Sequence, residues 1–118
     1  MLYDMRFQSP DDPVLMVYRD RVRLNRAGAL LLGLNETPRV SFKTDDSGHV
    51  YIGSRPFASI KVNRAGGRYT IASVKLARKL ASMLDGPGTY RIEQETSDVD
   101  HAGVRYYLIF WRKYEASN

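Results

Sequence analysis

The spacing of apolar residues along the chain switches between a strand-like and a helix-like pattern. Residues 14–18 form a continuous apolar run, which is typical of a buried strand, and residues 21–24 alternate polar and apolar, as a half-buried strand does. In the second segment, the valine and the leucine would face the core and the two arginines would project to solvent. The pattern therefore predicts two strands joined by a tight connection.

Two helices are predicted from capping residues and apolar spacing. Asn25 can cap a short helix over residues 26–32 that ends at Gly33. Ser73 can cap a longer helix over residues 74–84, because apolar residues recur there at helical spacing and an Asp-Gly-Pro-Gly turn follows. Each helix would follow a pair of strands.

The remaining apolar segments predict six further strands, separated by polar turns. The strands cover residues 39–43, 50–53, 57–62, 68–71, 89–95 and 104–113, and the turns cover residues 44–49, 63–67 and 96–103. The order strand–strand–helix–strand–strand therefore occurs twice along the chain.

This repeated order predicts the domain organisation. The two ββαββ halves are residues 14–53 and 57–113, and Ser54-Arg55-Pro56 is the candidate linker. We expect one α+β, β-rich domain over residues 14–113, with an N-terminal arm (1–13) and a C-terminal tail (114–118).

The composition is that of a chain that folds around a core without disulfides. Hydrophobic residues make up 43% of the 118 residues, which suffices for a core at this length, and cysteine is absent. No apolar run approaches the length of a membrane span, and no stretch has the features of a signal peptide. We therefore expect a cytoplasmic protein that does not bind a membrane.

Positive charge is concentrated in the middle of the chain. The net charge is +5, but residues 19–79 contain 13 basic and 4 acidic residues, a local balance of +9, while the segments on either side are each −2. Arginine, whose planar guanidinium suits phosphate, accounts for 13 of the 18 basic residues. This distribution favours a basic surface, provided that the fold gathers these residues on one side.

Two segments carry a resemblance to a known family. Arg68-Tyr69-Thr70-Ile71-Ala72, followed by a helix, resembles the segment that leads into the helix of AbrB/SpoVT-type swapped-hairpin DNA-binding domains, with Ala72 where that family has proline. Leu31-Leu32-Gly33-Leu34 resembles the Leu-Gly-Leu helix exit of the same domains. Two chains usually build the barrel of that family, so the resemblance implies a pseudo-symmetric barrel made by the two halves of one chain.

The resemblance also implies a function for the basic residues. If it carries over, the first hairpin of each half presents cations to DNA phosphates, and a pseudo-two-fold axis would place both sets on one face. The matching residues are Arg19, Arg21, Arg23, Lys61, Arg64 and Arg68. We therefore expect a small DNA-binding, transcription-regulator-like module whose partner is duplex DNA.

A different class of function is compatible with the same pattern. The exposed strands could pair with a protein partner or a second copy of the chain, as in an accessory protein of a mobile element without a nucleic-acid role. In that case the arginines near residue 21 would guard an edge strand against aggregation. Salt-dependent binding of duplex DNA separates the two hypotheses.

Residues that could support catalysis or metal binding have simpler structural explanations. Asp98-x-Asp100-His101, and Asp45-Asp46 with His49, are polar groups in turn-like segments without a second cluster of ligands. Ser73 lacks the context of a nucleophile elbow and is better explained as a cap. The sequence therefore predicts no enzyme, no metal, no cofactor and no small-molecule substrate.

The last predicted strand is rich in aromatic residues. Tyr106, Tyr107, Phe110 and Trp111 could form a platform for stacking nucleobases. Strands that are apolar on both faces are usually buried, so core packing is the favoured interpretation of these residues.

Overall fold

A computed structural model describes residues 12–113, which form nine strands and two helices. The helices are α1 (Arg26–Leu32) and α2 (Val74–Met83). The strands are β1 (Val14–Val17), β2 (Val22–Leu24), β3 (Arg39–Thr44), β4 (Val50–Ser54), β5 (Ile60–Lys61), β6 (Asn63–Ala65), β7 (Arg68–Ile71), β8 (Gly88–Val99) and β9 (Arg105–Lys113). The predicted arm up to residue 11 and the predicted tail lie outside the described residues.

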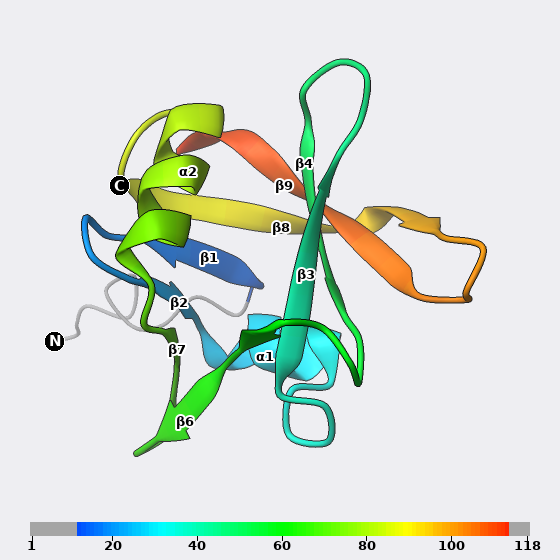
Figure 1. The fold of residues 1–118 in the computed structure, drawn as a ribbon. Coiled ribbons are helices and arrows are strands. Elements are labelled where there is room, and N and C mark those ends of the chain that lie inside the picture. The colour runs from blue at the N-terminus through cyan, green and yellow to red at the C-terminus, as the bar shows by residue number, and fades with distance from the viewer. Residues whose placement is uncertain (1–11, 114–118) are drawn as a thin grey trace, which may run out of the picture.

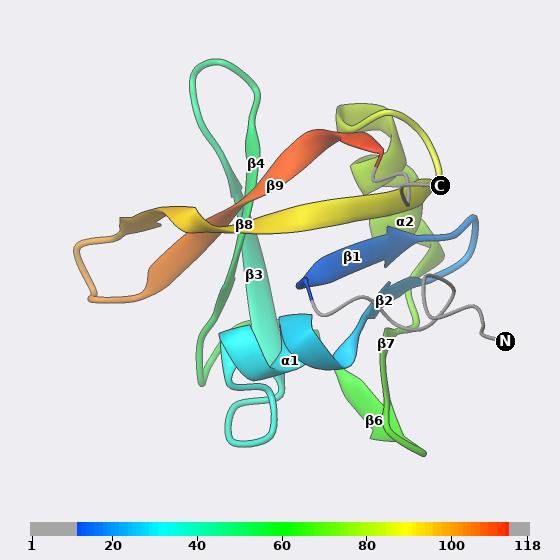
Figure 2. The same ribbon diagram turned by 180° about the vertical axis from the view of Figure 1, so that it is seen from behind.

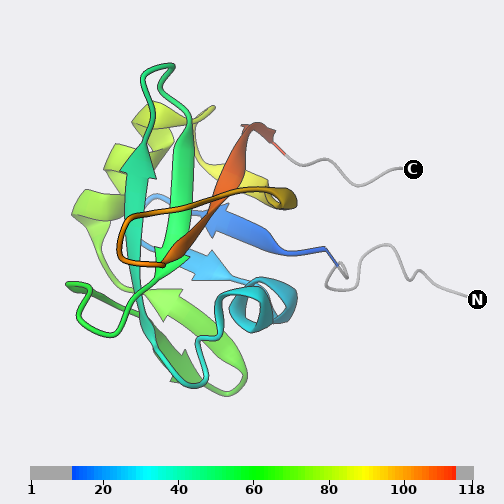
Figure 3. The ribbon, with the colours of Figure 1, turned by 90° about the vertical axis from the view of Figure 1, so that its right-hand side faces the viewer.

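The strands form one antiparallel sheet that curls into a nearly closed barrel. The strand order is β5-β3-β4-β9-β8-β1-β2-β7-β6, so the two outermost strands are consecutive in the chain and only Val62 separates them. The Val62 amide donates to the Pro38 carbonyl at 2.8 Å, which joins this bend to the start of β3. Figures 1 and 3 show the sheet curving round, with the hairpin β3–β4 crossing the hairpin β8–β9.

The core fills the inside of this barrel and is lined by alternate strand residues. Val22 lies opposite Ile71 and Leu24 lies opposite Tyr69 across the β2–β7 pair, and all four side chains are buried. Both helices contribute to the same cluster of buried residues, through Ala29 and Leu32 of α1 and Ala77 and Leu80 of α2. The helices lie on opposite sides of the barrel, as the view from behind also shows (Figure 2).

The predicted helix caps are present. The Asn25 side-chain oxygen accepts hydrogen bonds from the amides of Gly28 (2.8 Å) and Val14 (3.0 Å), and Gly33 ends α1 with a left-handed φ of 68°. The Ser73 hydroxyl accepts from the Leu76 amide at 3.1 Å at the start of α2. These local signals account for the accuracy of the predicted helix positions.

Three predicted boundaries are wrong. The predicted strand over residues 57–62 is reduced to β5, and the predicted turn over 63–67 contains β6, so only its two glycines form the turn. β8 continues to Val99 instead of ending at residue 95, because the exposed hairpin β8–β9 extends beyond the barrel. Hydrogen bonding to distant strands decides these boundaries, and local composition does not reveal it.

The fold class is as predicted at the coarse level: a strand-rich α+β globule with two helices and a nearly closed antiparallel, barrel-like sheet. Among the described residues, no helix has the length and apolar character needed to cross a membrane.

Candidate nucleic-acid interface

The second strands of the two predicted basic hairpins, β2 and β7, are direct neighbours in the sheet. β2 pairs with β7 in antiparallel register, so Arg23 lies opposite Thr70, and β7 in turn pairs with β6. Because successive side chains of a strand point to opposite faces of the sheet, the residues that alternate with the buried ones project outward. Arg23 therefore projects from the barrel, as the alternation in the sequence predicted.

Arg21 and Arg23 are held against one aromatic ring. Their guanidinium carbons lie 4.6 and 5.6 Å from the centre of the Tyr18 ring, within the range of cation–π contact. Arg21 also forms an ion pair with Asp20, Nη1 to Oδ1 at 2.9 Å, and both side chains of this pair are exposed. An exposed pair of this kind contributes little to stability, so Arg21 can exchange its partner at low cost.

The second predicted set of cations divides between different surfaces. Arg68 lies opposite Ala65 and two residues from Thr70, so it projects from the same face as Arg23. Arg64 lies opposite Tyr69, and its guanidinium carbon is 5.9 Å from that ring, so the pleat directs it to the other face of the sheet. Of this set, Arg68 joins the first set.

Lys61 lies farther away because the chain bends at Val62. Before the bend, β5 pairs with β3, and Lys61 lies opposite Arg39. Arg39 donates to the Ala58 carbonyl at 3.0 Å, which orients it towards the loop before β5. Lys61 therefore belongs with β3, whereas Arg19 stays near Arg21, exposed in the connection between β1 and β2.

The outward face around Arg23 carries no acidic residue at its paired strand positions. We define the arginine face as the outward positions of β1, β2, β7 and β6 with the connection before β2: Met16, Tyr18, Arg19, Asp20, Arg21, Arg23, Asn63, Ala65, Arg68 and Thr70. Asp20, in the connection, is its single carboxylate. Beyond it on β8, Arg91 is paired with Asp12 at 3.4 Å. The arginine face therefore has a net positive charge.

Basic residues of α2 form a neighbouring positive surface. Lys75, Arg78 and Lys79 are exposed on one side of the helix, and α2 lies beside the β1–β2 connection (Figures 1 and 2). No carboxylate of residues 12–113 lies within ion-pair distance of these three side chains. These three residues are not among the predicted contacts to DNA, although their helical spacing is a signal in the sequence that places them on one side of the helix.

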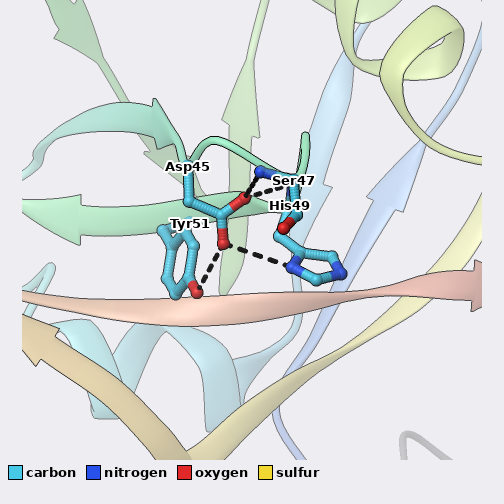
Figure 4. A network of polar contacts seen from close by, with 4 residues as sticks. All are labelled: Asp45, Ser47, His49 and Tyr51. Atoms are coloured by element: carbon cyan, nitrogen blue, oxygen red, sulfur yellow. Dashed lines mark hydrogen bonds and ion pairs between the residues drawn. The ribbon is translucent and has the colours of Figure 1, made fainter.

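The predicted turn after β3 is organised by Asp45. Its Oδ1 accepts hydrogen bonds from the amides of Ser47 and His49, both at 2.9 Å, and its Oδ2 accepts from the Tyr51 hydroxyl at 3.1 Å and lies 3.2 Å from the His49 ring nitrogen (Figure 4). The His49 amide is the main reason why the pKa of Asp45 falls below its usual value. Burial, and then the bond to this carboxylate, raise the pKa of Tyr51.

A second turn, after β8, has the same construction. Asp100 accepts hydrogen bonds from the amides of Ala102 and Val104 at 2.9 Å, and the Val104 bond is the largest cause that lowers the pKa of Asp100. Lys43 of the crossing hairpin lies 3.7 Å from the same carboxylate. In the part of the chain that the structure describes, no three His, Cys, Asp or Glu side chains gather as metal ligands do. Both aspartates act as turn residues here.

The aromatic strand is mostly packed against the core, in agreement with the prediction of core packing. Tyr106 is buried, and Tyr107 is half-buried against the core. Trp111 differs, because the residue is 42% exposed and its ring centre lies 4.6 Å from that of the His49 ring. One residue of the four therefore remains available as a platform.

Comparisons with known proteins give no relative for this chain. No family model matches it, and neither a curated protein nor a solved structure is similar to it.

Proposed function

We propose that this protein binds duplex DNA through phosphate contacts made by the arginine face, as a small transcription-regulator-like module in the cytoplasm. The observation that carries the proposal is the arrangement of Arg21, Arg23 and Arg68 on one outward face with one exposed carboxylate beside them. Binding, and not catalysis, is the role that such a surface supports.

The packing of the arginines favours phosphate as their ligand. Contact with Tyr18 restricts the motion of Arg21 and Arg23, so less side-chain entropy is lost when an anion binds. The guanidinium group also presents a planar set of donors that matches phosphate oxygens. The basic side of α2 would extend the contact to further phosphates.

A pseudo-two-fold relation between the halves is part of the proposal. If β1 is exchanged with the β5–β6 segment, β2 with β7, β3 with β8, and β4 with β9, the order of strands round the barrel is unchanged. The turns at Asp45 and Asp100 have matching hydrogen bonds and glycines with φ of 84° and 85°. Both features support a swapped-hairpin-like barrel made by one chain.

The salt dependence of binding to a labelled 20-base-pair duplex tests the proposal. Fluorescence anisotropy should show binding that weakens steeply with NaCl, since each phosphate contact contributes about 0.9 to the log–log slope. Arg23→Ala should reduce the slope by about one such contact, whereas Lys61→Ala, a charge-matched control away from the arginine face, should leave it unchanged. Absence of duplex binding at low salt would exclude the proposal.

One observation favours a second candidate function. β1 pairs only with the first four residues of β8, whereas Glu93 and residues 97–99 pair with β9 alone, on either side of an irregularity in the strand. This leaves a strand edge that a protein partner could extend by strand addition. Glu95→Pro would block that edge, and loss of a co-purifying partner in this variant, with no duplex binding by the parent protein, would support the alternative.

A further inference from the structure

Trp111 is the exposed aromatic residue of an otherwise packed strand. Its indole contacts the ring of Phe110 and the ring of His49, each with a centroid distance of 4.6 Å and a tilt of about 30°. These neighbours restrict the motion of the ring, while the residue remains 42% exposed to solvent. A flat, fixed and accessible ring is the arrangement used to stack nucleobases.

The ring also borders a cavity with cations beside it. The cavity has a volume of about 630 Å³ and is lined by Leu84 and Asp85, which follow α2, and by Trp111, Arg112 and Lys113 of β9. Arg112 and Lys113 are exposed. A ligand ring that stacks on Trp111 would therefore have two positive side chains within reach of an attached anionic group.

The part of the cavity wall that follows α2 is anchored to the core. The Asp85 amide donates to the Tyr90 hydroxyl at 2.9 Å, and this hydroxyl donates to the Gly86 carbonyl. Tyr90 is fully buried, so the chain after α2 is fixed to the core at this point. This part of the cavity wall is therefore fixed before a ligand binds, which lowers the entropy cost of filling the cavity.

We propose that this cavity binds a nucleotide, with the base stacked on Trp111 and the phosphate bound by Arg112 and Lys113. The base and phosphate could belong to a free nucleotide or to an unpaired nucleotide of a single strand. The site uses none of the residues of the arginine face, so it does not depend on the binding of duplex DNA proposed above.

Intrinsic fluorescence gives a direct test, because Trp111 is the only tryptophan of the chain. Titration with deoxythymidine monophosphate and with the single strand (dT)12 should quench it saturably. Tighter binding of the oligonucleotide would identify a single strand as the source, and tighter binding of the mononucleotide would identify a free nucleotide. Arg112→Gln should weaken the binding of both, whereas Arg105→Gln, on the same strand and away from the cavity, should titrate like the parent protein.

Further arms of the experiment make the proposal falsifiable. Trp111→Ala, if circular dichroism shows it to be folded, should bind labelled (dT)12 at least about fivefold more weakly, since stacking on an aromatic residue contributes that much per base. Trp111→Phe, which keeps an aromatic ring, should lose less affinity for (dT)12 than Trp111→Ala does. Absence of quenching by both ligands, an unchanged titration of Arg112→Gln, or equal quenching by a blunt duplex whose bases are already stacked would overturn the proposal.

Discussion

Asn25 joins three parts of the chain through one buried side chain. Its oxygen accepts from the amides of Gly28 and Val14, and its amide group donates to the Asp12 carbonyl at 2.8 Å. The residue is 6% exposed and is the buried polar residue of the described core. The sequence predicted its role as a helix cap from local pattern, but the bond to β1 comes from tertiary structure.

Loss of this side chain should therefore lower the free energy of unfolding by more than loss of an ordinary helix cap does. We expect Asn25→Ala to lower the free energy of unfolding by about 2–4 kcal/mol, because a cap is lost and two buried backbone groups lose partners. Ser73→Ala, which removes a cap alone, should cost about 1 kcal/mol. Urea denaturation of both variants measures the difference, and equal losses would contradict this assignment.

Asp45 and Asp100 should make the stability of the protein depend on pH in the acidic range. Hydrogen bonds lower the pKa of both carboxyl groups in the folded state, so both stabilise the fold above the pKa of the unfolded chain, about 3.9. This stabilisation is lost as the pH falls through the folded-state values. Asp45→Asn or Asp100→Asn should make the loss of stability between about pH 5 and pH 2 shallower. Parallel pH profiles for parent and variants would refute the effect.

At the scale of elements, prediction succeeded where the signal was local. Both helices, their caps and the strands before them followed from spacing and capping residues. The β5–β6 bend was not predicted, because the chain pairs with β3 before Val62 and with β7 after it. No local sequence pattern signals this change of partner strand. The bend also separates Lys61 from Arg68, whereas the pleat of β6 directs Arg64 to the other face of the sheet.

Gly53 shows how closely two strands approach where the halves meet. It lies on β4 opposite Tyr106 of β9, and an added Cβ would lie 2.9 Å from the Arg105 carbonyl oxygen and from a carbon of the Tyr106 ring. We expect Gly53→Ala to lower the free energy of unfolding by about 1–3 kcal/mol, because backbone and a buried ring must shift. An unchanged midpoint in urea would show that the strands adjust freely.

The basic residues of α2 should lower the stability of the protein slightly and strengthen its binding to duplex DNA. Lys75 stands in the first turn, where the helix dipole disfavours a cation, and four residues before Lys79, which repels it. Lys75→Glu should stabilise the protein by a few tenths of a kcal/mol and weaken duplex binding. Thermal unfolding and anisotropy measure the two effects. Arg78→Gln, which is farther from the helix start, should weaken binding with a smaller change in stability.

At the scale of the whole molecule, the closure of the barrel determines which cations lie on the same face. The sequence contained a basic middle segment, but the closure of the sheet through β5 and β6 determines that β2 and β7 are neighbours. This closure could not be predicted from composition, because it depends on pairing between residues almost fifty positions apart. The resulting face brings Arg21, Arg23 and Arg68 together as one phosphate-binding surface in our proposal.

The most direct test of this surface compares the salt slopes of duplex binding. The triple variant Arg21→Ala, Arg23→Ala, Arg68→Ala should have a log–log slope smaller than that of the parent protein by about 2.7, which corresponds to three phosphate contacts. A control variant with the same loss of charge elsewhere, Arg55→Ala, Lys61→Ala, Arg105→Ala, should keep the parent slope. Equal slopes for the two triple variants would contradict the account.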